Sequence, residues 1–336
     1  MNKHITILLL FFSFAGLAQI PDGYYDEAEG LTGNDLKTAL HYIIDNHKEY
    51  SYNDLRDFIL KNTDEDPNNS NNVILLYTGR SQAKSTFGGG ANDWNREHVW
   101  AKSHGNFGNS PPAGTDAHHI RPTDASVNSI RGNLDFDMGG TPLTEAPGCK
   151  KDGDSFEPRD EVKGDVARML FYMAVRYEGG DGVADLELVD HVNTYPNPEH
   201  GKLQKLLDWH LMDPPNEFEL NRHEVIFSYQ ENRNPFVDHP EYVELIWGDP
   251  NATVENETLI INIYPNPVTS SLNIEYFNGE DLKYSIISVD GKKIKEGITH
   301  SGNNTLEINS LKQGLYLILL RNDNNSIVHQ YKIIKQ

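Results

Sequence analysis

The amino-acid sequence predicts an α+β protein: a mostly helical domain containing one strand–strand–helix motif, followed by a small all-β sandwich. Apolar residues recur at helical spacing before residue 249, whereas short alternating strands fill the chain after residue 259. Charge divides in the same place. Residues 1–259 contain 21 Lys and Arg against 43 Asp and Glu, and residues 260–336 contain 8 against 7. We therefore expect domains at 19–248 and 260–336, joined by a linker at 249–259.

The extreme N-terminus is typical of an export signal. Lys3 supplies a positive charge, Ile5–Leu17 is apolar, and the small residues Gly16 and Ala18 fit a signal-peptidase site, so residues 1–18 are expected to be removed. Outside this segment no apolar run reaches about 18 residues, and we expect no membrane-spanning helix in the mature chain. The single cysteine, Cys149, excludes an intramolecular disulfide and a cysteine-rich zinc site.

Helical periodicity accounts for most of the first domain, with one buried strand expected at Val73–Tyr77. The helix at Asp165–Glu178 is predicted to be amphipathic and to stop at Gly179 and Gly180. The other helices are expected around Leu36–Ile44, Leu55–Leu60, Gly201–Leu211, Asn216–Tyr229 and Pro240–Trp247.

The second domain follows a polar, turn-rich segment at Asp249–Glu257. Strands at short spacing over roughly 75 residues favour a β-sandwich. They are expected at Leu272–Tyr276, Tyr284–Ser288, Leu306–Ile308, Gly314–Leu320 and Ile327–Ile334, with a turn at Asp290–Gly291.

The overall charge excludes one class of function. With 29 Lys and Arg against 50 Asp and Glu, the protein is too acidic to coat nucleic acid through its bulk charge. The segment Asn95–Asn133 is an exception, since it contains four Lys and Arg, three acidic residues and four histidines. Any surface that binds anions must therefore be local.

Glu97 and His98 suit the hydrolysis of a phosphodiester, which needs a base for water and a hard cation at the phosphate. The pKa of a histidine lies near neutrality, so His98 is the candidate base. Glu97 offers a carboxylate oxygen for Mg²⁺ or Ca²⁺. Because neighbouring side chains of a strand point to opposite faces, the two can share a site only at a strand end or bend.

A short helix is predicted at Thr123–Arg131, capped by Thr123 or Asp124. Asn128 and Arg131 are three residues apart and share a face of this helix. Asn128 offers an amide oxygen for the metal, and Arg131 offers a guanidinium for a phosphate. A strand pair carrying Glu and His, followed by a helix carrying Asn, is a compact arrangement for a metal-dependent nuclease.

Five runs in this order resemble the endonuclease I family, which comprises secreted or periplasmic nucleases of the ββα-metal (His-Me finger) type. They cover about residues 75–247. The matching runs are Asn95–Trp100, Asp116–Pro122, Val127–Asn133, Gly164–Arg168 with Phe171–Tyr177, and Gln230–Phe236 with Asp238–Pro240.

This resemblance implies metal-dependent, sequence-nonspecific cleavage of DNA, and often of RNA, that leaves 5′-phosphates. Carried over by position, His98 is the general base, and Glu97 and Asn128 are ligands of Mg²⁺, with Ca²⁺ or Mn²⁺ as other possible ions. Arg131 and Arg121 are our candidates for catalytic phosphate contacts. Further candidates for substrate binding are Arg96, Lys102 and His118.

The C-terminal region, about residues 260–336, resembles the sorting domain of the bacterial type IX secretion system. The resemblance rests on Ile263–Val268, the Asp290–Gly291 turn and Gly314–Leu317. It implies contact with the type IX machinery, and a protein that is secreted or held at the cell surface after export through the periplasm. An adhesive or carbohydrate-binding sandwich is the alternative for this region.

Other interpretations stay open. His118 and His119 are a zinc pair or structural hydrogen-bonding residues, and Asp152, Asp154 and Glu157 are a calcium site or a solvated loop. Asn232–His239 contacts substrate or bridges helices. For the whole chain, the alternatives are an adhesin whose nuclease domain is inactive and a metal-dependent phosphomonoesterase. We expect a monomer.

Overall fold

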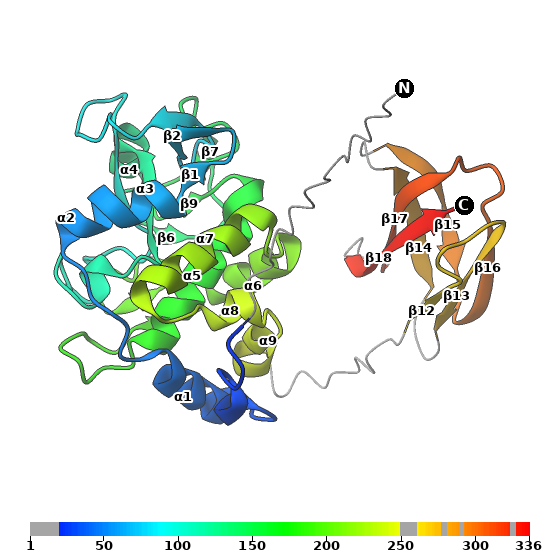
Figure 1. Ribbon diagram of the computed structural model, residues 1–336, viewed down its shortest axis with the longest axis horizontal. Helices are drawn as coiled ribbons and strands as arrows, with labels where there is room; N and C mark the ends of the chain where they lie inside the picture. Colours follow the sequence, from blue (N-terminus) through cyan, green and yellow to red (C-terminus); the bar gives the residue numbers. More distant parts are fainter. Residues whose placement is uncertain (1–19, 249–260, 277–280, 289–291, 323–326) are drawn as a thin grey trace, which may run out of the picture. The chain divides into compact units, whose positions relative to one another are not determined.

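The computed structural model describes residues 20–248, 261–276, 281–288, 292–322 and 327–336. The chain divides into two units, one ending at Gly248 and the other beginning at Asp249 (Figure 1). The expected signal peptide, the expected linker and the Asp290–Gly291 turn lie outside the described residues.

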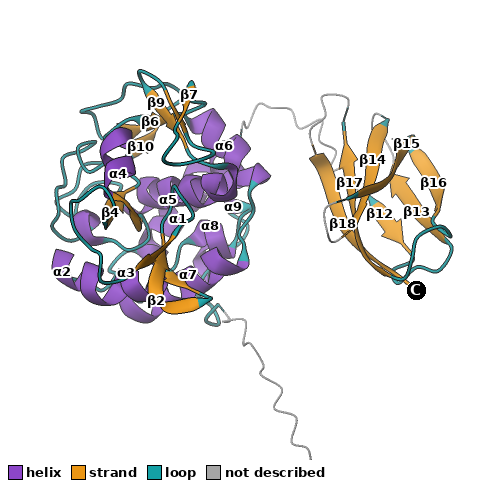
Figure 2. Cartoon of the chain, turned by 90° about the horizontal axis from the view of Figure 1, so that it is seen from above, coloured by secondary structure: helices purple, strands orange, loops and turns teal. Residues whose placement is uncertain are grey.

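The first unit combines helices with short strands (Figure 2). Its α-helices are α1 Gly33–Ile44, α2 Tyr52–Asp54, α3 Leu60–Thr63, α4 Ala125–Arg131, α5 Lys163–Arg176, α6 Leu203–Met212, α7 Glu217–Gln230, α8 Pro235–Asp238 and α9 Tyr242–Trp247. The 3₁₀ turns are η1 Asp26–Ala28, η3 Ala113–Thr115 and η4 Asp160–Val162, and η2 Leu55–Ile59 is a π-helical turn between α2 and α3. Its strands are β1 Glu65–Asp66, β2 Asn69–Ile74, β3 Ser81–Ala83, β4 Trp94–His98, β5 Ile120–Asp124, β6 Asp135–Phe136, β7 Thr141–Pro142, β8 Lys150–Lys151, β9 Ser155–Glu157, β10 Glu187–Leu188 and β11 Glu199–His200.

The strands form four small sheets, ordered β1-β2-β3, β4-β5, β6-β9-β8-β7 and β10-β11. The strand expected at Val73–Tyr77 is displaced, because β2 ends at Ile74. Leu75 and Leu76 continue as buried chain, and the Leu76 N–H donates to Pro122 O in β5. This contact ties the first sheet to the strand pair that carries Glu97 and His98.

Helix α5 is the centre of the first unit, with α1, α6 and α8 packed against it (Figure 1). The prediction that this helix is amphipathic is wrong, because all its residues are buried. Its charged side chains are paired instead of solvated. Arg168 Nε donates a hydrogen bond to Glu219 Oε1 of α7 at 2.8 Å. Asp165 Oδ2 lies 3.1 Å from a guanidinium nitrogen of Arg121 in β5. These ion pairs permit a helix with polar residues to lie inside the core.

Asp116 is a buried hub between η3, α5 and α7. Its carboxylate accepts hydrogen bonds from the hydroxyls of Tyr172 and Tyr177, at 2.8 and 2.9 Å, and from Gln230 Nε2 at 3.0 Å. Oδ1 also accepts from the N–H of His118 at 2.9 Å. The loop that leads into β5 is therefore fastened to the central helix.

We expect Asp116→Ala to lower the free energy of unfolding by about 3 kcal/mol or more, since several buried donors lose their shared acceptor. All four tryptophans lie in the first unit, so tryptophan fluorescence during urea unfolding reports on that unit alone. Glu161→Ala, which removes an exposed carboxylate, is the control. Equal unfolding midpoints for the two variants would contradict the claim that the Asp116 carboxylate stabilises the first unit.

The second unit consists of two antiparallel sheets, ordered β12-β13-β16 and β15-β14-β17-β18 (Figure 2). Buried side chains from both sheets, including Ile274, Ile286 and Ile318, form one core. The strands are β12 Asn262–Tyr264, β13 Ser271–Tyr276, β14 Leu282–Ser288, β15 Lys293–Thr299, β16 Gly302–Glu307, β17 Gly314–Arg321 and β18 Ile327–Lys335. Across the described residues of both units, every helix is too short or too polar to span a bilayer.

Candidate functional site

The predicted site residues lie on a strand pair followed directly by a helix. Strands β4 and β5 pair antiparallel, with Glu97 opposite Arg121 and His98 opposite Ile120, and α4 begins at the residue after β5. Trp94, at the start of β4, is fully buried beside Val73 and Leu75 and anchors the pair. The predicted cap of α4 is absent, because the Asp124 side chain pairs with Thr78 and Arg80 instead.

A cavity of about 420 Å³ opens beside this motif. Six of the predicted residues line it, namely Arg96, Glu97, His98, Lys102, Asn128 and Arg131. Glu97 and His98 reach the same space because His98 is the last residue of β4, where the alternation of the strand ends. The lining holds three cationic side chains and one carboxylate, although the whole chain carries a net charge of −21.

His98 has one nitrogen fixed and one nitrogen free. Nε2 lies 3.2 Å from Gly114 O, and because a carbonyl only accepts, the neutral ring carries its proton on Nε2 and donates there. Within the described part of the chain no hydrogen bond to Nδ1 is found. Burial lowers the pKa of His98 well below its usual value, and the nearby His119 acts in the same direction. At neutral pH His98 therefore presents an unprotonated Nδ1.

Glu97 is likewise held by one atom. Oε1 accepts a hydrogen bond from the buried Tyr77 hydroxyl at 2.7 Å and lies 3.3 Å from an Arg131 nitrogen. Oε2 accepts no hydrogen bond from any residue that the structure describes. Burial raises the pKa of Glu97, while Arg131 and Tyr77 oppose that rise. The arrangement leaves one hard oxygen of Glu97 available at the cavity.

Asn128 is oriented by its amide nitrogen. Nδ2 lies 3.1 Å from Arg96 O and 2.8 Å from Asn95 Oδ1. Since Arg96 O can only accept, the atom facing it must be the nitrogen, and the amide oxygen points the other way. Oδ1 has no partner among the described residues. The side chain therefore offers a neutral oxygen to the cavity that also receives Glu97 Oε2.

The turn η3 sets the position of His98, and apart from Gly114 itself no local pattern predicts this turn. His119 Nε2 lies 2.8 Å from Ala113 O, so His119 holds η3 in place. The next residue of η3, Gly114, contacts His98 through its carbonyl oxygen. A Cβ at Gly114 would lie 2.7 Å from Gly108 O and 2.8 Å from the carbonyl carbon of Asn109. Only glycine permits this close approach of two backbone segments.

We expect Gly114→Ala to lower kcat about 10- to 100-fold, because the displaced carbonyl no longer orients the His98 ring. The readout is phosphodiester cleavage at saturating substrate. Gly153→Ala is a matched control, since a Cβ there meets open space. A Gly114→Ala enzyme with the kcat of the control would show that η3 does not position His98.

Arg131 differs from expectation, because it is only 1% exposed and bonded to protein. Its guanidinium donates to His98 O at 3.1 Å and to Val99 O at 2.7 Å, and it lies beside Glu97 Oε1. These contacts join the end of α4 to the end of β4. A guanidinium so engaged holds Glu97 in place and is not free to clamp a phosphate.

Arg96 and Lys102 are the cations that face the cavity more openly. Lys102 is exposed, and its ammonium donates to Asn109 Oδ1 at 2.8 Å. The Arg96 guanidinium lies 3.3 Å from the centre of the Tyr52 ring, and Tyr52 stacks on His98 with ring centres 5.8 Å apart. Burial lowers the pKa of Arg96, which still carries its charge at neutral pH.

Two predicted residues do not reach the cavity. Arg121 is bound to Asp64 and Asp165 in the network around α5. His118 is buried against Tyr172, and its Nε2 lies 3.3 Å from Asn232 O. Both side chains lie on the inner side of the motif, so the predicted catalytic contact of Arg121 and substrate contact of His118 do not fit this geometry.

The open interpretations of other clusters resolve toward structural roles. His119 is held by Ala113 O, and His118 by Asn232 O, so the two rings do not form a zinc pair. Glu157 is paired with Lys150 and Lys163, and Asp152 Oδ1 accepts from the backbone N–H groups of Asp154 and Ser155, which favours a loop held by its own hydrogen bonds. The Asn232–His239 segment bridges helices: Asn234 caps α8 and also donates to Arg168 O.

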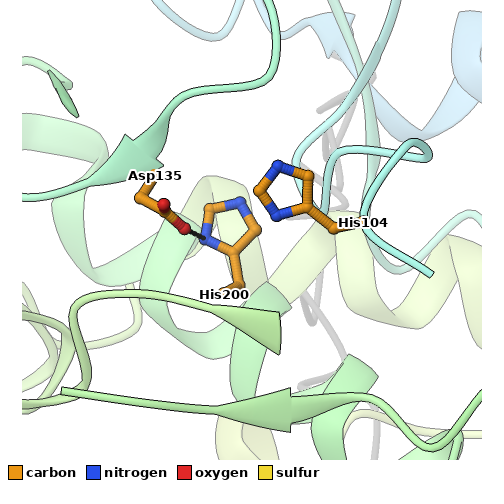
Figure 3. Close-up of side chains that lie close together, drawn as sticks. All are labelled: His104, Asp135 and His200. Atoms are coloured by element: carbon orange, nitrogen blue, oxygen red, sulfur yellow. Dashed lines mark ion pairs between the residues drawn. The ribbon is translucent and has the colours of Figure 1, made fainter. Parts of the chain in front are cut away.

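Among the residues that the structure describes, two other groups of side chains have the composition of a metal site. The first is His104, Asp135 and His200, all buried (Figure 3). His104 has carbonyl oxygens 2.8 Å from both ring nitrogens, and His200 lies 3.2 Å from the Arg131 guanidinium. The second is His223, Glu224 and Asp238, into which Arg233 inserts its guanidinium. In each group the donor atoms are already engaged and a cationic side chain is adjacent, so neither fits a divalent ion as well as the cavity.

Two sequence profiles of known families match the chain. The sequence profile described as Endonuclease I matches residues 32–241, which include β4, β5, α4 and all residues of the cavity. The profile described as a secretion system C-terminal sorting domain matches residues 262–336, the second unit.

Two curated relatives are each named extracellular ribonuclease. The protein of Bacillus subtilis (strain 168) is 60% identical over 227 residues, and that of Bacillus amyloliquefaciens is 61% identical over 225 residues. Each match covers 67% of this chain and 78% of the relative. Among solved structures, one reported for PorZ, a surface component of the type-IX secretion system of Porphyromonas gingivalis, matches at 12% identity with a TM-score of 0.20. It covers 26% of this chain and 12% of that one, too little to indicate a shared fold.

Proposed function

This chain belongs to the endonuclease I family, and from that premise we propose that it hydrolyses phosphodiester bonds of both DNA and RNA at the cavity beside β4 and α4, leaving 5′-phosphate ends. The protein is a nuclease, and its sorting domain and extracellular relatives make it a secreted or cell-surface one. The sorting domain also implies contact with the type IX machinery.

One observation supports this proposal most strongly. Three residues that line one cavity each have one polar atom held by protein and a second atom without a partner among the described residues. These second atoms are His98 Nδ1, Glu97 Oε2 and Asn128 Oδ1. Strands β4 and β5 and helix α4 hold these three residues, and we assign this strand–strand–helix unit as a ββα-metal motif. Free polar atoms gathered in a buried site suggest a shared ligand.

The donor set fits a hard divalent cation. Endonuclease I enzymes are metal-dependent. A carboxylate oxygen and an amide oxygen are the ligands that Mg²⁺ and Ca²⁺ prefer, and Mg²⁺ takes few protein ligands and completes its shell with water. Glu97 and Asn128 would hold the ion, which when bound stabilises the negative charge that develops on the phosphate. We propose Mg²⁺, with Mn²⁺ or Ca²⁺ as substitutes.

His98 is the general base in this scheme. Its free Nδ1 takes a proton from a water molecule, and the oxygen of that water attacks phosphorus. The bond between phosphorus and the 3′ oxygen breaks, and the leaving oxygen takes a proton from solvent water. One fragment therefore ends in a 3′-hydroxyl and the other in a 5′-phosphate. The fixed Nε2–H···O contact to Gly114 keeps the ring in the tautomer that this step needs.

Lys102 and Arg96 supply the remaining charge for substrate. Contacts from these side chains go to phosphates and not to base edges, which gives low sequence specificity. Because the rest of the first domain is strongly acidic, we expect weak binding that falls as the salt concentration rises.

The test uses supercoiled plasmid and a structured RNA, each incubated with the purified chain and Mg²⁺, with or without excess chelator. We expect both substrates to be cleaved only with free Mg²⁺. The fragments should accept a 5′-label from polynucleotide kinase only after phosphatase treatment. Ends that accept the label directly would contradict the 5′-phosphate, and an intact RNA would restrict the proposal to DNA.

A further inference from the structure

A line of buried polar contacts leads from Glu97 away from the cavity. Glu97 Oε1 lies 3.3 Å from Arg131, and a second nitrogen of Arg131 lies 3.2 Å from His200 Nε2. His200 Nδ1 then lies 3.3 Å from Asp135 Oδ1. All four side chains are at most 2% exposed. Water therefore does not substitute for any contact in the line.

The chemistry of these groups fixes the direction of each contact. A guanidinium has hydrogens only to donate, so His200 Nε2 must accept from Arg131, and the proton of the neutral ring must lie on Nδ1. That proton faces Asp135 Oδ1 and, at 3.1 Å, Gly201 O. Burial lowers the pKa of His200 to about 3, in keeping with a neutral ring.

Asp135 ends this line of contacts, and its carboxylate is held in place by three hydrogen bonds. Its Oδ1 accepts from the Thr194 hydroxyl at 2.7 Å and from the Gly201 N–H at 2.8 Å, and its Oδ2 accepts from the Thr194 N–H at 2.9 Å. The His200 ring is clamped as well, since it stacks on Phe136 with ring centres 5.4 Å apart. Figure 3 shows the Asp135 carboxylate turned toward the His200 ring.

We propose that Asp135 and His200 are positioning residues that hold Arg131, and through it Glu97, so that Glu97 Oε2 faces the divalent cation. Asp135 and His200 therefore act on the metal ligand Glu97 through Arg131, and they do not themselves bind the metal. This inference rests on the proposed function, because it assumes that Glu97 is a ligand. Partners that orient a metal ligand typically contribute about 10- to 100-fold in metal affinity.

The test measures Mn²⁺ binding by isothermal titration calorimetry, without substrate. His200→Phe keeps a flat ring against Phe136 but removes the acceptor for Arg131, and we expect it to bind Mn²⁺ about 10- to 100-fold more weakly than wild type. His200→Gln restores an acceptor oxygen and should recover most of the affinity. His210→Phe, which removes a buried histidine on α6, is the matched control and should bind as wild type does.

Glu97→Gln separates the two proposals. If it binds Mn²⁺ as wild type does, Glu97 is not a ligand and the proposed site is wrong. If Glu97→Gln loses binding while His200→Phe retains it, only the positioning role is wrong.

A second measurement does not depend on how His200→Phe folds. In protein labelled with ¹⁵N-histidine, the His200 signal, assigned by its absence in His200→Gln, must show a neutral ring protonated on Nδ1. A ring protonated on Nε2 would overturn the inference.

Discussion

Replacing His98 with alanine is expected to lower kcat for phosphodiester cleavage by about 10²- to 10⁴-fold, the usual contribution of a general base. The physical reason is the free Nδ1, which the Gly114 carbonyl selects by binding the opposite nitrogen. The affinity for Mn²⁺ should change little, since neither proposed metal ligand is altered. Thermal unfolding is followed alongside, because the substitution removes a buried ring and its hydrogen bond to Gly114 O. Single-turnover cleavage of a fluorescent oligonucleotide with Mg²⁺ measures the chemical step.

His210→Ala serves as the control for this experiment. His210 is also buried, and burial lowers its pKa to about 4, but it lies on α6 and outside the cavity. It should keep near wild-type kcat. An active His98→Ala enzyme would mean that another group takes the proton from water.

Glu97→Gln is expected to lower kcat about 10³-fold at a fixed, subsaturating Mg²⁺ concentration, because the phosphate loses the cation that stabilises its charge. Excess chelator should have the same effect on the unchanged chain. The substitution also leaves the Arg131 guanidinium buried without its counter-ion, which costs about 3 kcal/mol of stability. Thermal unfolding must therefore be followed alongside activity.

Glu157→Gln is the matched control, since Glu157 is a buried carboxylate that is paired with Lys163 and does not line the cavity. It should lose stability but keep its metal dependence. If Glu97→Gln responds to Mg²⁺ with the same midpoint as Glu157→Gln, Glu97 does not bind the ion.

Local signals predicted most of the helices and several strands. Helix α7 begins where expected because Asn216 caps it, accepting hydrogen bonds from Phe218 and Glu219. The burial of α5 on all sides was beyond such signals, since the partners of its charges lie in β5 and α7. Strand β15 was missed because it is rich in lysine, which suits its place at the edge of a sheet.

In the candidate site too, local sequence signals predicted some residues, whereas residues that depend on long-range contacts were missed. The adjacent residues Glu97 and His98 and the spacing of Asn128 are visible in the sequence, and all three line one cavity. What the sequence leaves open is which arginine is exposed. Arg121 and Arg131 look alike in a sequence, but long-range ion pairs and carbonyl contacts bury both. His200 and Gly114 were missed because their roles depend on residues that meet only in the folded chain.

The most direct test of the metal site is an anomalous difference map from crystals of His98→Ala grown with Mn²⁺. We expect one strong peak within coordination distance of both Glu97 Oε2 and Asn128 Oδ1. A peak among His104, Asp135 and His200 instead, or no peak beside Glu97, would contradict the account.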